Sequence, residues 1–282
     1  MKKFLSLLLA AGLALSATAC AGGAASSSEA ASESEAASSE AAVSEAASEE
    51  AASEDATAEE AAPAAVMTYD EYMAAAVDDA VTIESYVQAK QSYYAEQGTA
   101  TVYLQGEDGA YFAYDMACTQ EEYDQMTEGT KIRVSGYKAE WSGEVEIMDG
   151  QLEEIIAGDT YVAEPVDVTE LLGTDELESR QNQKVTFTGL TIAPSTIEGD
   201  ETEYAFLYNY DGSGTQGDDV YFNVEYNGET YQFLVESYLC DSSTDVYKAV
   251  EALEIGQTID CEGFLYWYEG VNPHITSVTV TG

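Results

Sequence analysis

Hydrophobic and polar residues alternate along much of the chain from about residue 80 onward, a pattern that predicts β-strands separated by polar turns. In the first half the strand-like segments cover residues 81–89, 99–105, 110–116, 130–141 and 144–153. In the second half they cover residues 184–193, 204–210, 220–226, 229–236, 258–268 and 274–280. Asp108-Gly109 and Ser142-Gly143 stand between neighbouring segments, as hairpin turns do. The chain is therefore expected to be mainly β.

Three short helices are predicted among these strands, at residues 68–79, 119–126 and 243–253. The first two begin with a capping box, in which a Thr is followed three residues later by a Glu: Thr68 with Glu71, and Thr119 with Glu122. Residues 161–178 are predicted to link the two halves.

The chain repeats itself. The segment GTKIRVSGY at residues 129–137 returns 127 residues later as GQTIDCEGF at 256–264, and Cys118 corresponds to Cys240 further upstream. Self-similarity of this length predicts two copies of one fold.

Each copy has strands, a short helix and then two further strands, with Gly punctuating the long strands, and this order resembles the OB-fold, a small Greek-key barrel. The resemblance implies two tandem OB-fold-like barrels of five or six strands, each with a short helix, at residues 67–162 and 163–282. The extra segment 204–210 leaves a more elaborate second barrel open.

The N-terminus has the features of an export signal. Lys2 and Lys3 precede an apolar run at residues 4–15 that is too short to span a membrane, and small residues lead to Cys20. This resembles the lipobox of bacterial lipoproteins, although Ala17 stands where Leu is usual. The resemblance implies a signal peptide at residues 1–19 and an acylated Cys20. Ordinary cleavage after the Ala17-x-Ala19 pattern is the alternative.

Residues 20–66 would then form a tether. Beyond Cys20 this segment consists almost wholly of Ala, Ser, Glu and Gly and has no aromatic or basic residue, so it is expected to stay disordered. Ala and Glu also favour helix, but the interleaved Ser and the missing apolar stripe argue against a stable one. As a whole the chain is similar to surface lipoproteins of gut-type Gram-positive bacteria, which implies a lipid-anchored protein on the extracytoplasmic face of the cell membrane.

Acidic residues dominate the chain, with 54 Asp and Glu against 9 Lys and Arg. The segment beyond residue 66 carries a net charge near −36, because 11 of the acidic residues precede it and two of the basic ones are Lys2 and Lys3. Such a charge repels phosphate backbones, so nucleic acid is expected to be a poor partner.

The chain lacks a recognisable catalytic motif and has one histidine, His274, so it is expected not to be an enzyme.

Three cysteines follow Cys20. Cys240 and Cys261 are able to pair as a disulfide, while the alternative is that all three, including Cys118, are buried free thiols.

OB-folds that bind ligands do so across strands 2 and 3, between the loop after strand 1 and the loop joining strands 4 and 5. By this resemblance, the candidate ligand-binding residues are Lys90, Gln91, Tyr93, Tyr94, Lys138 and Trp141 in the first copy and Tyr266, Trp267 and Tyr268 in the second. Aromatic faces beside hydrogen-bonding groups suit sugar rings or peptides, whereas the alternative is that these aromatics are half-buried core residues.

Asp211, Asp218 and Asp219 lie in a Gly-rich loop and are candidate calcium ligands, because calcium binds several oxygens on a tight loop. A flexible hairpin connection explains the same composition.

The leading function is a membrane-anchored, non-enzymatic extracellular lipoprotein that binds carbohydrate or protein. The alternatives are an interaction subunit of an envelope complex and, with less support, a nucleic-acid-binding OB module.

Overall fold

The computed structural model describes residues 65–282, so the predicted signal peptide, Cys20 and nearly all of the tether lie outside the described residues. The described residues belong to one compact unit. Within 65–282, no helix has the length and apolar character needed to cross a membrane.

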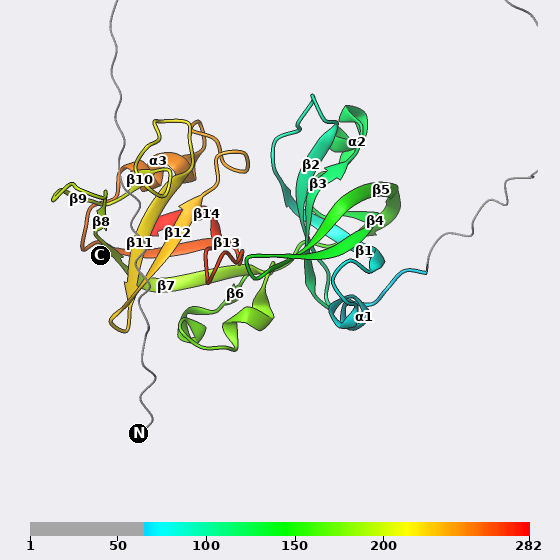
Figure 1. The fold of residues 1–282 in the computed structure, drawn as a ribbon, viewed down its shortest axis with the longest axis horizontal. Helices are drawn as coiled ribbons and strands as arrows, with labels where there is room; N and C mark the ends of the chain where they lie inside the picture. Colours follow the sequence, from blue (N-terminus) through cyan, green and yellow to red (C-terminus); the bar gives the residue numbers. More distant parts are fainter. Residues whose placement is uncertain (1–64) are drawn as a thin grey trace, which may run out of the picture. The chain divides into compact units, whose positions relative to one another are not determined.

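The first copy folds into a closed five-stranded barrel (Figure 1). Hydrogen bonds join its strands in the order β1-β2-β3-β5-β4, and β4 pairs again with β1. The helix α1 (Tyr69–Ala74) precedes the barrel, and α2 (Gln120–Gln125) connects its third strand to its fourth. The strands are β1 (Ala80–Lys90), β2 (Thr99–Gln105), β3 (Ala110–Ala117), β4 (Thr130–Trp141) and β5 (Glu144–Thr160).

The second copy closes in the same order. Its five barrel strands pair as β7-β11-β12-β14-β13, and β13 returns to β7. In each barrel the third and fifth strands are parallel and a short helix precedes the fourth strand, here α3 (Asp245–Glu251). The strands are β7 (Lys184–Ala193), β11 (Val220–Tyr226), β12 (Glu229–Val235), β13 (Thr258–Phe264) and β14 (His274–Val280). The prediction of two OB-fold-like barrels is confirmed.

The predicted strand 204–210 is two short strands instead of one. Its start, β9 (Glu203–Tyr204), pairs with β8 (Ser195–Thr196), whereas its end, β10 (Leu207–Tyr208), pairs with β11. Because its two ends have different partners, the segment adds no sixth strand to the ring. Between the barrels the chain forms β6 (Val166–Asp167) and the 3₁₀ helices η1 (Thr169–Leu171) and η2 (Leu177–Arg180).

Both predicted capping boxes are present, at Thr68 with Glu71 and at Thr119 with Glu122. The first helix is nevertheless shorter than the predicted 68–79. The Nζ of Lys138 donates hydrogen bonds to the carbonyls of Met73 and Ala75, at 2.7 and 2.9 Å, which satisfies the free acceptors at the helix C-terminus. The helix ends at Ala74, because Ala75 already has an extended backbone, with ψ 145°.

Each barrel has its own apolar interior. The first is filled mainly by aliphatic side chains, among them Val81, Ile83, Val102, Ile132 and Ile147. The second includes three buried phenylalanines, Phe187, Phe222 and Phe233. The predicted domain boundary at residues 162 and 163 falls between β5 and β6, and independent folding of the two halves stays a prediction.

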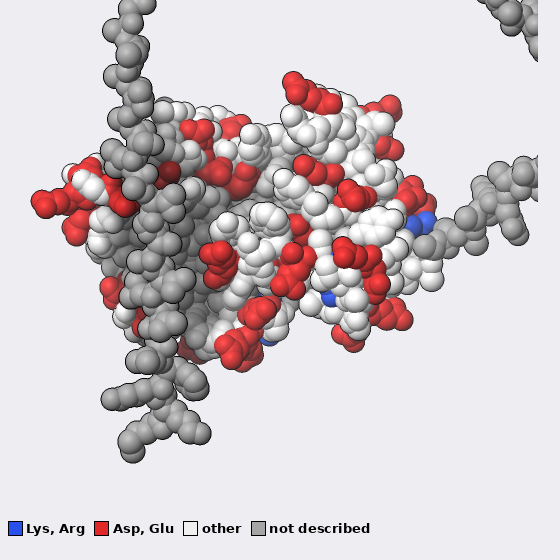
Figure 2. Space-filling model, in the orientation of Figure 1, with Lys and Arg blue, Asp and Glu red and all other residues white. Residues whose placement is uncertain are grey.

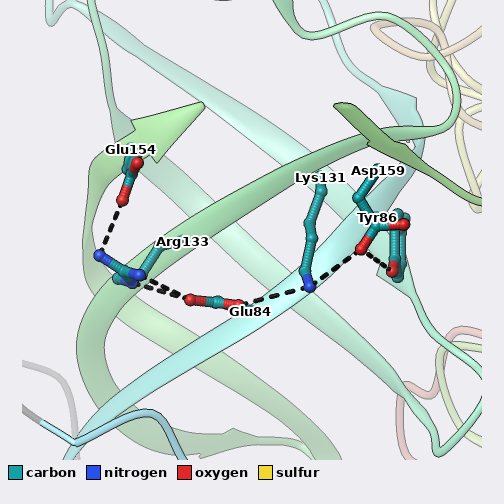
Figure 3. A network of polar contacts seen from close by, with 6 residues as sticks. All are labelled: Glu84, Tyr86, Lys131, Arg133, Glu154 and Asp159. Carbon is teal, nitrogen blue, oxygen red and sulfur yellow. Dashed lines mark hydrogen bonds and ion pairs between the residues drawn. The ribbon is translucent and has the colours of Figure 1, made fainter. Parts of the chain in front are cut away.

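A polar network covers the outside of the first barrel where β1, β4 and β5 lie side by side (Figure 3). Arg133 donates to Glu84 Oε1 from Nε and Nη2, at 3.0 and 2.7 Å, and to Glu154 from Nη1 at 2.8 Å. Lys131 lies 3.4 Å from Glu84 and 3.2 Å from Asp159. The Arg133 hydrogen bonds hold the pKa of Glu84 below its usual value.

Candidate functional site

The two barrels meet in a buried seam, built around the aromatic side chains Tyr103, Phe112 and Phe264. The rings of Tyr103 and Phe264 lie 4.6 Å apart between centroids, and the Tyr103 hydroxyl lies 2.5 Å from Nδ1 of His274. Tyr103 belongs to β2, whereas Phe264 and His274 belong to β13 and β14. Side chains of both copies therefore share one small core.

Hydrogen bonds extend the seam along the turn between β4 and β5. Gln181 donates to the carbonyl of Gly143 at 2.7 Å, and the backbone N–H of Trp267 donates to Glu144 Oε2 at 2.9 Å. Gly143 has a φ of +94°, and a Cβ on it would lie 2.8 Å from the indole of Trp267. This turn thus needs glycine both for its backbone conformation and for the close approach of Trp267.

Beside this seam lies a cavity of about 520 Å³, which we call the aromatic pocket. It covers the second and third strands of the second barrel and the loop between the fourth and fifth, the face on which OB-folds bind ligands. The first barrel contributes Trp141, from the end of β4. Its walls include five aromatic side chains and two carboxylates: Trp141, Tyr210, Tyr221, Tyr266, Tyr268, Asp219 and Glu236.

Hydrogen bonds fix both carboxylates of the aromatic pocket. Asp219 Oδ1 accepts from the backbone N–H and the hydroxyl of Ser237, at 2.8 and 2.7 Å. Glu236 Oε2 accepts from the N–H of Leu239 at 2.8 Å. Burial raises the pKa of Glu236 to about 7, and the nearby charge of Asp219 adds to the effect. A cation in the pocket would favour the ionised form of Glu236.

His274 forms part of the floor of the same pocket. Its ring stacks on Tyr266 with 4.3 Å between centroids, and burial lowers its pKa to about 3. The imidazole is therefore neutral at physiological pH and adds no positive charge to the pocket.

Two further carboxyl groups are buried at the seam. Glu144 is fully buried, and its Oε1 has no hydrogen-bond partner among the described residues. Burial raises the pKa of Glu144 to about 8 and that of Glu146 to about 7. Glu144 is therefore mostly protonated at neutral pH, which avoids the cost of burying its charge, whereas Glu146 is near the midpoint of its titration.

The structure divides the predicted ligand-binding residues among several places. Trp141, Tyr266 and Tyr268 come together in the aromatic pocket, although Trp141 belongs to the other copy. Gln91, Tyr93 and Tyr94 line a separate cavity of about 460 Å³. Trp267 packs over Gly143 and lines a third, more open hollow.

The two predicted lysines lie in neither of the first two cavities. Lys90 donates to the carbonyl of Tyr123 and lies over that ring, 3.7 Å from its centroid. Lys138 is buried against the end of α1. Sequence reasoning missed Tyr210, Tyr221 and Glu236, because strand pairing rather than a local motif brings them to the pocket.

The three candidate calcium ligands do not form a cluster. Asp211 accepts from the N–H of Ser213 at 3.0 Å and Asp218 from that of Thr215 at 2.8 Å, as in turn-forming loops, while Asp219 faces the aromatic pocket. Within residues 65–282 no group of three or more His, Cys, Asp or Glu is arranged to hold a metal ion. Calcium binding stays a prediction.

The three thiols at Cys118, Cys240 and Cys261 are free and buried. Burial raises the pKa of Cys118 and of Cys240 to about 11, so both are protonated at neutral pH. They therefore fit the predicted packing role better than a nucleophilic one.

Acidic side chains are scattered over the face in Figure 2, which shows few Lys or Arg. Most of the seven basic residues beyond residue 64 are already engaged within the protein, Lys184 with Glu262 and Lys248 with the carbonyl of Ser243 among them. Among the residues lining the aromatic pocket there is no Lys or Arg. A ligand there would meet negative charge and aromatic rings.

No protein-family model matches the chain, and no curated protein matches it. Solved structures do match. A murine DNA-binding protein bound to double-stranded DNA is 12% identical, with a TM-score of 0.33 over 71% of this chain and 96% of that one. The Ifi202 HINa domain in complex with double-stranded DNA is 11% identical, with a TM-score of 0.32 over 72% and 98%. A replication protein A heterotrimer bound to single-stranded DNA is 10% identical, with a TM-score of 0.28 over 72% and 49%.

These matches correct the expected function and partners. The three matched proteins are described with bound DNA, so the expectation of a carbohydrate or protein ligand, with nucleic acid as a poor partner, is wrong, and the nucleic-acid alternative is the better supported of the two. The physical reason for the error is that the same face of the OB-fold binds different classes of ligand in different proteins. TM-scores this low assign no ligand to this chain, so the ligand class has to be argued from its own side chains.

Proposed function

We propose that this protein is a non-enzymatic binding protein whose aromatic pocket takes an organic cation. The observation that carries the proposal is the composition of the pocket walls: five aromatic side chains and the carboxylates of Asp219 and Glu236, with no Lys or Arg among the lining residues. The face of an aromatic ring attracts a cation, and aromatic cages are a known way of binding quaternary ammonium groups.

The charge of the protein supports a cationic ligand. The described residues carry a large excess of Asp and Glu. The negative electrostatic potential of these carboxylates raises the local concentration of small cations near the surface. The size of the pocket, about 520 Å³, suits a small organic molecule.

Choline tests this proposal, because it has a close neutral isostere in 3,3-dimethylbutanol. Each is titrated into the full-length chain at constant ionic strength, with binding followed by calorimetry and by tryptophan fluorescence, to which Trp141 in the pocket contributes. We expect saturable choline binding at roughly millimolar concentration and at least fivefold weaker binding of the isostere, because each cation–π contact contributes about 0.5 to 1 kcal/mol at a partly exposed site. Equal affinities, or no saturation by either compound, would overturn the proposal.

Two variants localise the binding. Asp219→Asn keeps the shape of the side chain and removes its charge, so choline should bind several-fold more weakly. Asp211→Asn removes one charge from the neighbouring loop outside the pocket and should leave the affinity unchanged. A similar loss in both variants would indicate general attraction to the acidic surface.

A second candidate ligand is an unpaired nucleobase. Trp141, Tyr210 and Tyr268 are 60, 69 and 51% exposed around one pocket, and exposed rings on OB-folds stack bases. The acidic surface opposes this candidate because phosphate affinity depends on basic residues. Saturable binding of a ten-residue oligothymidylate at 50 mM salt, weakened by Tyr268→Ala, would favour it over the cation.

The proposed location is the extracytoplasmic face of a bacterial membrane, with the protein held there by acyl groups on Cys20. The support is the order of Lys2 and Lys3, the apolar run at residues 4–15 and the small residues before Cys20.

A further inference from the structure

A second cavity, of about 460 Å³, lies over the binding face of the first barrel, and we call it the tyrosine pocket. The loop after β1 contributes Tyr93 and Tyr94, β3 contributes Tyr114 and Asp115, and the second copy contributes Tyr238. Four aromatic rings and one carboxylate thus face a single cavity. No Lys or Arg is among the residues that line it.

Backbone hydrogen bonds hold the walls of the tyrosine pocket in place. The carbonyl of Tyr238 accepts from the N–H of Ser92 at 2.8 Å and from its hydroxyl at 3.1 Å. The Tyr93 hydroxyl donates to the carbonyl of Cys118 at 3.1 Å. The wall formed by Tyr238 is therefore tied directly to the loop of the other copy, and the pocket is complete only when the barrels are docked.

Asp115 supplies the single carboxylate among the residues that line the tyrosine pocket. It lies within β3 at a φ of +44°, a left-handed conformation that is uncommon for a residue other than glycine. Its N–H donates to the hydroxyl of Thr101 at 3.1 Å, while its carboxylate has no hydrogen-bond or ion-pair partner among residues 65–282. Strained residues of this kind cluster at ligand clamps, and here the strain accompanies a free anion on a pocket wall.

We propose that the tyrosine pocket is a second binding site and that its ligand is a small primary amine. An alkylammonium group has three N–H donors and needs acceptors as well as aromatic faces. Asp115 supplies a charged acceptor, and the side-chain oxygens of Gln91, Gln97 and Ser92 supply neutral ones. A fully methylated ammonium has no N–H group and therefore cannot donate hydrogen bonds to these acceptors. The inference is independent of the aromatic pocket, since the two cavities share no lining residue.

The test is a titration of the full-length chain with butylammonium chloride, monitored by the amide NMR signals of Ser92 and Asp115. Tetramethylammonium and 1-butanol serve as comparison ligands at the same ionic strength. We expect saturable shifts with butylammonium and at least fivefold weaker binding of both comparison ligands. Butylammonium that leaves the signals of this pocket unmoved would overturn the proposal.

A matched pair of variants separates a built site from general attraction to acidic residues. Asp115→Asn removes the pocket charge and keeps a residue that tolerates the left-handed conformation, so the chain should fold. Asp149→Asn is the control, because Asp149 is also a strand residue with a positive φ, 51°, yet is exposed and lines no cavity described above. Butylammonium should bind at least fivefold more weakly to the first variant and equally to the second. Equal affinity for both variants would contradict the proposal.

Tyr238→Ala tests the contribution of the second copy. Removing this ring should weaken butylammonium binding several-fold and leave choline binding in the aromatic pocket unchanged. Loss of choline binding in Asp219→Asn with retained butylammonium binding would show that the two sites act separately. If butylammonium binds while choline does not, the second site stands and the proposed function of the aromatic pocket fails.

Discussion

Tyr103 on β2 and His274 on β14 share a buried hydrogen bond, with 2.5 Å between the hydroxyl oxygen and Nδ1, although 171 residues separate them. The bond crosses the seam between the two barrels and lies beside the aromatic pocket, to which His274 contributes. Burial lowers the pKa of His274 to about 3, so its imidazole is neutral at physiological pH and is held in place by the buried tyrosine.

Tyr103→Phe should destabilise the protein, because it leaves Nδ1 of a buried imidazole without its partner. We expect a loss of about 1 to 3 kcal/mol in the free energy of unfolding, measured by urea denaturation. Tyr137→Phe is the control, since Tyr137 is an exposed residue of β4, and it should change stability by less than about 0.5 kcal/mol. Equal stability of the two variants would show that the seam bond contributes nothing.

Stability should fall as pH rises from about 4.5 to 8. The carboxyl groups of Glu144, Glu146 and Glu236 have folded-state pKa values of about 8, 7 and 7, raised by burial from 4.5. Within this window the unfolded chain has released these protons while the folded protein retains them, so each pH unit costs up to about 1.4 kcal/mol per carboxyl. The melting temperature should therefore be higher at pH 5 than at pH 8.

Carboxyl groups with lowered pKa values act in the opposite sense but at lower pH, and His274, whose pKa burial lowers from 6.5 to about 3, opposes the fall only up to about pH 6.5, as one group against three. Glu84 and Asp159 contribute stability above their unfolded values of 4.5 and 3.8, and that stability is lost as pH falls further. Glu144→Gln should reduce the drop in melting temperature between pH 5 and pH 8 by several degrees, whereas Glu140→Gln, at an exposed position, should leave the drop as it is. An unchanged drop in Glu144→Gln would contradict this assignment.

Arg133→Lys should weaken the surface network, because lysine does not reproduce the paired bonds from Nε and Nη2 to Glu84. The side chains are partly exposed, so the expected loss is only about 0.5 to 1 kcal/mol and should shrink at high salt. Arg180→Lys is the matched control, since Arg180 has no ion pair among the described residues. Unfolding in urea at 0.05 and 1 M NaCl measures both variants, and a salt-independent loss would argue against an electrostatic cause.

Cys20→Ser should release the protein from the membrane. In a bacterial host the wild type is expected in the detergent phase after phase separation, because an acyl chain favours the apolar phase. The variant is expected in the aqueous phase. Identical partition of the two proteins would refute the lipid anchor.

Local features of this fold were predictable from the sequence. The capping boxes at Thr68 and Thr119, the turns at Asp108-Gly109 and Ser142-Gly143, and the duplication marked by Gly129 all appear where the residues placed them. Capping and turn formation depend on neighbours three or four residues away, so they are encoded locally. The split of residues 203–208 into β9 and β10 was not predictable, because it depends on which strand each half meets.

The candidate sites depended on the tertiary structure. The sequence indicated aromatic residues such as Trp141 and Tyr268 as ligand-binding, but it assigned them to separate barrels, whereas the fold places both in one pocket. It also gave no sign that Tyr238 would close a cavity on the other copy, or that Lys138 would be buried against α1. By itself the sequence determined two similar barrels and an acidic surface. Docking of the barrels decided which side chains face a cavity, because contacts across a seam join residues that share no local pattern.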